Sequence, residues 1–312
     1  MAERFNFNGA EIIGIDHGYG HVKTRNYTVR SGITASDTKP YLNSDHILFE
    51  DRYYIVGEGH KAFSHVKSGD EDNHILTAMA LAKELRTRDI KGDAPVIIAA
   101  GLPLLWYGSQ KDSFKEYLLH GGRYRFTYRD ETRTVNIRDV RLFPQGSAAI
   151  APDIRSYKGM NVLIDVGNGT LSTIMIVNGR PIVERCHTDK FGAEVCIRKM
   201  REKILTETGY NAHYSYYDEF LKKGQEAVAN EKHIRIMENA AQEYVNDIMS
   251  LLGEWEYDPD NMLYTFMGGG AQTVRKYLPD DLREKCRFID DIRANAKGYE
   301  ALALAQLKRG QK

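Results

Sequence analysis

The sequence predicts an α/β protein built from two domains. Apolar runs of strand length alternate with helical patterns, and the 312 residues exceed the roughly 250–300 at which a single hydrophobic core stops growing. A strand ending in an acid and glycines also occurs twice, as Asp16-His-Gly-Tyr-Gly and as Asp165-Val-Gly-Asn-Gly. We therefore expect an internal duplication, with a crossing between the halves near 156–159.

The first half opens as a sheet and then alternates with helix. Residues 74–88 place apolar side chains at helical spacing, and Gln145 to Ile150 can begin a helix before Pro152. Two pairs of consecutive strands predict hairpins. They are 47–49 with 53–56, and 124–128 with 132–140, which Arg129-Asp130 joins. The expected strands are 11–16, 47–49, 53–56, 95–100, 124–128 and 132–140.

The second half repeats this alternation. Asn178-Gly179 is a strong type I′ hairpin signal, so we expect a hairpin of strands 170–177 and 181–186 after strand 162–165. A further strand is expected at 263–267. The expected helices are 191–208, 231–252 (ended by Gly253), a segment through Tyr277, and 293–307.

The charge balance argues against direct binding to nucleic acid. The 43 basic and 43 acidic residues cancel and no long basic block occurs, so any association with DNA should need an adaptor protein. The first residues lack an apolar signal core, and the most apolar stretch, 96–106, is about half the roughly 20 residues of a membrane-spanning helix. We expect a cytoplasmic protein without membrane contact.

The three cysteines predict reduced thiols. Cys186, Cys196 and Cys286 are an odd number at wide spacing without a Cys-x-x-Cys pair. Cys186 and His187 followed by Cys196 could indicate zinc, but a fourth ligand at usable spacing is missing, which favours buried apolar thiols.

The two glycine turns carry the strongest chemical signal. Glycines let backbone N–H groups approach phosphate oxygens, the Thr170 hydroxyl adds a donor, and a strand-end carboxylate can hold the waters of Mg²⁺. One such turn is weak evidence, because Asp and Gly are ordinary turn formers; two facing turns could clamp a polyphosphate. Rossmann and Walker loops are disfavoured, because strand residues follow the second turn and no Gly-Lys-Ser/Thr occurs.

A third glycine segment has a similar position at a strand end. Phe266-Met-Gly-Gly-Gly-Ala271 runs from a strand into a helix, where the backbone could pass close under a flat adenosine. A tight strand-to-helix turn is the simpler interpretation. Its place after the paired turns favours nucleotide binding.

The order of these segments resembles that of the actin, sugar-kinase and heat-shock chaperone ATPase superfamily. Within it, the chain resembles the ParM/StbA-type plasmid-segregation actins over nearly its whole length. The similar segments are Ala99-Ala-Gly-Leu-Pro-Leu104, Val140-Arg-Leu-Phe-Pro-Gln145, 162–170, 267–271 and Asn295-Ala-Lys-Gly-Tyr-Glu-Ala301.

The resemblance implies an actin-like ATPase fold, in which two ribonuclease H-like domains flank a nucleotide cleft. Domain I would be 1–157, with the C-terminal helix 293–312 packing back on it, and domain II would be 158–292. The implied activity is hydrolysis of Mg-ATP, with GTP possible as nucleotide, coupled to turnover of a head-to-tail filament. The implied cellular role is plasmid DNA segregation through a DNA-binding adaptor.

The resemblance also implies roles for individual residues. Asp16 and Asp165 would hold the water-bound Mg²⁺ and orient attack, and Gln145 would position the hydrolytic water. The residues around the phosphates would be Gly18, Tyr19, Gly20, Lys23, Gly167, Asn168, Gly169 and Thr170. The adenosine side would be Gly268, Gly269 and Gly270, with Glu194 and Lys297, for which exposed helix charges are the commoner explanation.

Two positions depart from the family pattern. Plasmid actins often carry glutamate where this chain has Gln145, and a neutral amide can orient a water but cannot act as a strong base. Asn168 replaces a glycine found in many relatives, and asparagine tolerates a left-handed backbone. We therefore expect the turn to survive and hydrolysis to be slow.

Two alternatives remain beside the filament-forming ATPase. A small-molecule kinase of the same superfamily would need a catalytic base near the γ-phosphate, which Gln145 cannot supply. A nucleotide-dependent scaffold, of the cell-shape actin or chaperone type, would bind nucleotide without a metabolic substrate.

Overall fold

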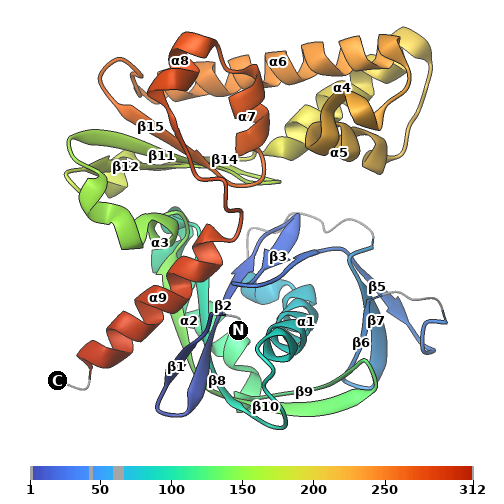
Figure 1. Cartoon of the computed structure of the whole chain (residues 1–312), viewed down its shortest axis with the longest axis vertical. Coiled ribbons are helices and arrows are strands. Elements are labelled where there is room, and N and C mark those ends of the chain that lie inside the picture. The colour runs from blue at the N-terminus through green and yellow to red at the C-terminus, as the bar shows by residue number, and fades with distance from the viewer. Residues whose placement is uncertain (1–2, 42–44, 59–66, 311–312) are drawn as a thin grey trace. The chain divides into compact units, whose positions relative to one another are not determined.

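The computed structural model describes residues 3–41, 45–58 and 67–310 and divides into two compact units (Figure 1). The first unit comprises 1–156 with 292–312, and the second comprises 157–291. Each unit has one sheet, of ten strands in the first and six in the second. The predicted α/β class is confirmed.

The sheet of the first unit has the order β4-β3-β2-β8-β10-β9-β6-β7-β5, with β1 paired to β2. Strands β2, β8 and β10 run parallel, so their carboxyl ends meet at one edge. The strands are β1 Phe5–Phe7, β2 Ala10–His17, β3 His21–Lys23, β4 Thr28–Arg30, β5 Ile33–Ser36, β6 His46–Phe49, β7 Arg52–Val56, β8 Pro95–Leu102, β9 Arg123–Tyr128 and β10 Glu131–Pro144.

Helices cover both faces of this sheet. The helices are α1 Asp72–Thr87, α2 Leu104–Leu119, α3 Ser147–Ile150 and α9 Ala294–Arg309, with 3-10 turns Lys67–Gly69, His120–Gly122 and Ala151–Ser156. Because side chains alternate along a strand, Ile13 and Ile15 of β2 pack with α1, whereas Ile12 faces the core beside α9. The strands curve around α1 in Figure 1.

The second unit packs helices on one face of its sheet (Figure 1). Its strand order is β13-β12-β11-β15-β16, with β14 on β12. The apolar side chains Val162, Ile164 and Val166 of β11 join the core with α4 and α6. The elements are β11 Met160–Val166, β12 Leu171–Val177, β13 Arg180–Pro181, β14 His187–Asp189, α4 Ala193–Thr208, α5 Tyr214–Lys223, α6 Glu231–Glu254, β15 Leu263–Met267, α7 Ala271–Tyr277, α8 Asp280–Lys285 and β16 Arg287–Phe288, with 3-10 turns Val183–Arg185 and Gly224–Ala227.

Helix α9 lies unusually close to the first sheet. A Cβ at Gly14 of β2 would overlap the carbonyl oxygen of Ala296, and one at Gly298 would overlap the carbonyl oxygen of Ala148 in α3. Glycines at these two positions therefore let the backbone of α9 pack directly against β2 and α3. A side chain at either position would prevent this close approach.

Buried ionic hydrogen bonds fix α9 in this place. The fully buried Glu300 carboxylate accepts bonds from Arg25 Nε (2.5 Å), Arg88 Nη2 (2.6 Å) and the Gly14 amide (2.9 Å). Arg88 Nε in turn donates to Glu84 of α1 at 2.7 Å. Charges this deeply buried persist only when they are paired and hydrogen-bonded, so α9, β2 and α1 are tied into one arrangement.

Two sequence expectations about the second unit were wrong. Of the expected strand 181–186 only Pro181 lies in a strand, the two-residue β13 that pairs with β12, and Val183–Arg185 form a 3-10 turn. Pro181 has no N–H to extend the ladder, and the chain leaves the sheet after Ile182 donates to the Met175 carbonyl. Gly253 does not end α6, which continues to Glu254.

Helix α2 was not predicted. It places only Phe114 and Leu118 in the core, so it lacks the apolar stripe that marks an amphipathic helix. None of the helices in the described ranges has the length and apolar character needed to span a bilayer.

Removing the charge of Glu300 should destabilise the first unit. In a Trp255→Phe background, Trp106 emission reports that unit alone, and we expect Glu300→Gln to lower its free energy of unfolding in urea by about 3–5 kcal/mol. The matched control is Arg52→Gln, which breaks the exposed pair with Asp37 and should change little. Equal urea midpoints for Glu300→Gln and the parent would show that the buried network is dispensable.

Candidate functional site

Asp16 lies at the carboxyl end of β2 and is held by two side chains. It stands opposite Lys23 in the β2-β3 hairpin, where Lys23 Nζ is 3.4 Å from Asp16 Oδ2. The side-chain amide of Gln145 donates to Asp16 Oδ1 at 3.1 Å. Three of the predicted site residues are thus brought together, around a carboxylate that is only 2% exposed.

Gln145 reaches Asp16 because β10 ends beside β8 and β2 at the same sheet edge. The chain leaves β10 after Pro144, and the Gln145 amide donates to the Leu102 carbonyl at 2.8 Å. Gly146 follows with φ 74° and ψ −60°, values that only glycine adopts readily. Gln145 therefore precedes α3, although the sequence placed it at the start of that helix.

The first glycine turn is held in place by Ser31, a residue that no sequence pattern singled out. Fully buried Ser31 donates from Oγ to the Gly18 carbonyl (2.7 Å) and from its amide to the Gly20 carbonyl (3.0 Å). In a trans peptide the N–H points opposite to the C=O. The peptides that follow Gly18 and Gly20 thus direct their N–H groups away from Ser31, an orientation suited to an anion.

Lys67 also contacts the first glycine turn. Its buried ammonium donates to the His17 carbonyl at 2.5 Å and lies 4.1 Å from the centre of the Tyr19 ring. Burial and the negative charge of Asp70 raise the pKa of Tyr19, which keeps its hydroxyl protonated at neutral pH. Tyr19 therefore contributes an uncharged side chain to the turn.

The second turn is built on the same principle with different partners. The Gly167 carbonyl accepts from the Ala193 amide and the Asn168 carbonyl accepts from the Glu194 amide, both at 2.9 Å, at the start of α4. The peptides after Gly167 and Asn168 consequently direct their N–H groups away from α4. Asn168 is not among the described residues with positive φ, so this turn does not use the left-handed backbone that asparagine tolerates.

The third glycine segment packs directly on the second turn. Strands β11 and β15 are parallel with Asp165 opposite Met267, and the Gly270 amide donates to the Val166 carbonyl at 2.9 Å. Gly268 has φ +88°, and a Cβ there would overlap Asp165 Oδ1. By contrast, a Cβ at the exposed Gly269 would meet nothing within 4 Å.

The remaining predicted residues lie near these elements. Gly169 and the half-buried Thr170 complete the second turn, and Glu194 is the second residue of α4. Lys297 lies on α9 and is half-buried, directly after Ala296, whose carbonyl oxygen contacts Gly14. Neither Glu194 nor Lys297 is a fully exposed helix charge.

The acidic side chains fit Mg²⁺ held through water. Both oxygens of Asp16 already accept hydrogen bonds, and across the described residues no group of three or more His, Cys, Asp or Glu side chains could enclose an ion. Mg²⁺ commonly retains several waters and uses only one or two carboxylates beside substrate phosphates, so the strand-end aspartate of either unit suits this kind of binding by itself. The three cysteines are unlinked thiols.

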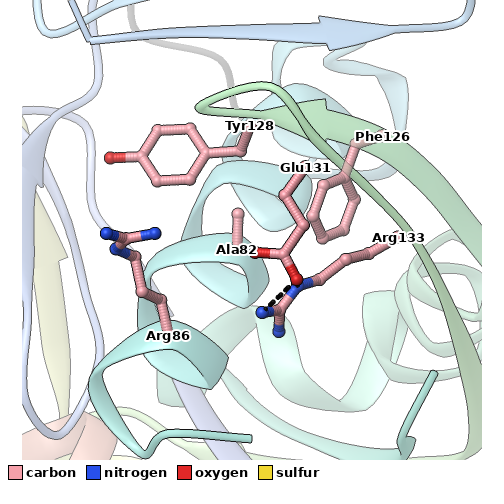
Figure 2. Close-up of a pocket in the computed structure, with 6 residues that line it drawn as sticks. All are labelled: Ala82, Arg86, Phe126, Tyr128, Glu131 and Arg133. Atoms are coloured by element: carbon pink, nitrogen blue, oxygen red, sulfur yellow. Dashed lines mark hydrogen bonds and ion pairs between the residues drawn. The ribbon is translucent and has the colours of Figure 1, made fainter. Parts of the chain in front are cut away.

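A small cavity in the first unit lies elsewhere. Figure 2 shows its lining on α1, β9 and β10, including Arg86, Tyr128 and the ion pair of Glu131 with Arg133 (2.7 Å). Its volume of about 10 Å³ matches roughly one water molecule. It includes no predicted site residue and is too small for a nucleotide.

Two family models match successive parts of the chain. The model of the N-terminal domain of actin-like proteins matches residues 14–147, and the C-terminal model of archaeal MreB-like actin homologues matches 163–280. Together they include every predicted site residue except Lys297. No curated protein matches the sequence.

Solved structures of actin-like proteins share the fold over nearly the whole chain, which confirms the predicted actin-like fold. The archaeal actin homologue Ta0583 in complex with ADP aligns with a TM-score of 0.69 and 22% identity, covering 94% of this chain and 98% of its own. A 15-stranded ParM filament from Clostridium botulinum gives 0.71 and 22%, covering 99% and 100%. Apo pSK41 ParM gives 0.71 and 15%, covering 98% and 100%.

Substitution of Gly268 should destabilise the second unit, whereas substitution of Gly269 should not. In a Trp106→Phe background, where Trp255 emission reports this unit, we expect Gly268→Ala to lose about 1–3 kcal/mol in urea, because the methyl meets Asp165 and the backbone is left-handed. Gly269→Ala is the control and should change little. Equal losses in the two variants would contradict the described packing of the turn on Asp165.

Proposed function

Because the chain belongs to the actin-like proteins, we propose that it is an ATPase that binds Mg-ATP and polymerises into filaments. In this proposal the two units correspond to the two actin-like domains, whose expected bounds, 1–157 with 293–312 and 158–292, differ from those of the units by one residue. Both glycine turns engage the phosphates of one nucleotide.

The observation that carries the proposal is the shared construction of the two turns. In each, a strand-end aspartate precedes the turn, and protein donors occupy the carbonyl oxygens: Ser31 in the first turn and the first amides of α4 in the second. Each turn thereby aims peptide N–H groups away from its own support, the arrangement by which backbone binds phosphate.

The proposed reaction is hydrolysis of the terminal phosphate. A water oxygen forms a bond to the γ-phosphorus while the bond from that phosphorus to the β,γ-bridging oxygen breaks, giving ADP and inorganic phosphate. Gln145 orients this water through its amide, and its hydrogen bond to Asp16 fixes the amide plane. Mg²⁺, held through water by Asp16 and Asp165, supplies neutralisation of the phosphate charge.

The remaining predicted residues complete the nucleotide site. Gly18, Tyr19, Gly20 and Lys23 in the first turn, and Gly167, Asn168, Gly169 and Thr170 in the second, surround the phosphates. The segment Gly268–Gly270 accommodates adenosine, and the open space above Gly269 supports this assignment. Glu194 and Lys297 border the base, which can be adenine or guanine.

Head-to-tail contacts that fail to close a ring would generate the proposed filament. Filament structures exist for relatives with this fold, including the Clostridium botulinum ParM filament. Since the net formal charge is zero, we propose that a DNA-binding adaptor links the filament to DNA in the cytoplasm. Tight binding of DNA by the purified chain at physiological salt would contradict the need for an adaptor.

Sedimentation with and without nucleotide tests polymerisation. We expect the purified chain to pellet with Mg-ATP and to release inorganic phosphate with no other substrate present, because water is the acceptor. Without nucleotide it should remain in the supernatant. Phosphate release that required an added small molecule would favour a kinase. A protein that stayed monomeric under every condition would contradict the proposed polymerisation.

Asp165→Ala should abolish most phosphate release. Loss of a charge that holds the metal waters and orients attack typically costs about 10²–10⁴-fold in kcat. The matched control is Asp260→Ala, which removes an exposed carboxylate of the same unit, paired with Lys285. If Asp165→Ala retained the rate of the control in a steady-state phosphate assay, Asp165 would have no part in the reaction.

A further inference from the structure

The backbone immediately after Gln145 is a strained turn. Gly146 has φ 74° and ψ −60°, and the Ser147 amide donates across it to the Gln145 carbonyl at 2.8 Å. This is a γ-turn of the rare, strained form with positive φ. Such conformations persist only where surrounding contacts determine them.

Asn295 supplies such a contact from a distant part of the chain. Its side-chain Oδ1 accepts from the Gly146 amide at 2.9 Å, and Asn295 is 5% exposed at the second position of α9. Without this acceptor the Gly146 N–H would be buried and unsatisfied. The acceptor therefore stabilises the γ-turn relative to other backbone conformations.

Helix α9 holds Asn295 firmly at this place. One turn further along, Gly298 lets the helix touch the Ala148 carbonyl of α3, and Glu300 is bonded to β2 and to two arginines. The same helix thus fixes both β2, which carries Asp16, and the turn that aims Gln145 at Asp16.

We propose that Asn295 is a positioning residue for hydrolysis, acting through the Gly146 turn to hold the Gln145 amide against Asp16. The inference rests on the proposed ATPase function, because Gln145 must orient the attacking water. Asn295 touches neither water nor nucleotide in this role. It sets the rate of the chemical step and leaves nucleotide binding nearly unchanged.

Three variants of α9 test this role. Asn295→Leu removes the acceptor at similar volume, and Asn295→Asp keeps an oxygen at the same position. Ala303→Gly is the matched control: it weakens the same helix in the core beside β2 but does not contact Gly146. Each is measured for hydrogen exchange of the Gly146 amide without nucleotide, for kcat and KM of ATP hydrolysis, and for Tm.

We expect Asn295→Leu to speed exchange of the Gly146 amide and to lower kcat by about 10-fold or more, with KM for ATP changed by less than about 3-fold. Asn295→Asp should restore both slow exchange and rate. Ala303→Gly should lower Tm while keeping the parental kcat.

Three outcomes would overturn the inference alone. They are unchanged exchange at Gly146 in Asn295→Leu, unchanged kcat in the same variant, and an equal fall of kcat in Ala303→Gly. Absence of phosphate release from the parent chain would instead overturn the proposed function, and the role of Asn295 in hydrolysis with it. The parent assay separates these cases.

Discussion

The close packing of α9 on β2 is the constraint on which the candidate site of the first unit depends. The two backbones meet at Gly14, where any side chain would overlap the Ala296 carbonyl oxygen. Glu300 then bonds the Gly14 amide and two buried arginines. Because Gly14 is two residues before Asp16, on the same face of β2, this contact fixes the strand end that presents the carboxylate.

The two glycine turns show how similar chemistry can be built from different supports. A buried serine side chain and backbone fasten the first turn, whereas the start of a long helix fastens the second. In the second turn, the amides of Ala193 and Glu194 already donate hydrogen bonds to carbonyl oxygens of the loop. The start of α4 therefore organises the turn, and in the proposed function the N–H groups of the turn's own peptides face the phosphates.

The sequence was sufficient to find residues whose signal is local. Asp16, Asp165 and Gly268 stand at strand ends among glycines, and the parallel strands bring Asp165 beside Gly268 as such a pattern requires. Ser31 and Asn295 could not be found in this way, since each acts through hydrogen bonds to another segment of the chain: Ser31 binds the first glycine turn and Asn295 binds Gly146. Resemblance identified Gln145, but only the fold shows that its amide contacts Asp16.

Errors in the predicted elements have the same origin. The segment 181–186 contains the β-branched residues Ile182 and Val183, yet Pro181 cannot donate to β12 and the chain turns away. Helix α2 has only Phe114 and Leu118 in the core, too few to produce a readable period. In both places tertiary contacts outweigh local preference.

We propose that both glycine turns hold the phosphates of one Mg-ATP. A crystal structure of the chain with Mg²⁺ and a non-hydrolysable ATP analogue is the decisive test. We expect phosphate oxygens within hydrogen-bond distance of the backbone at Gly18–Gly20 and at Gly167–Thr170, with the adenosine against Gly269. Phosphates that contact only one turn, or a nucleotide bound away from both, would contradict it.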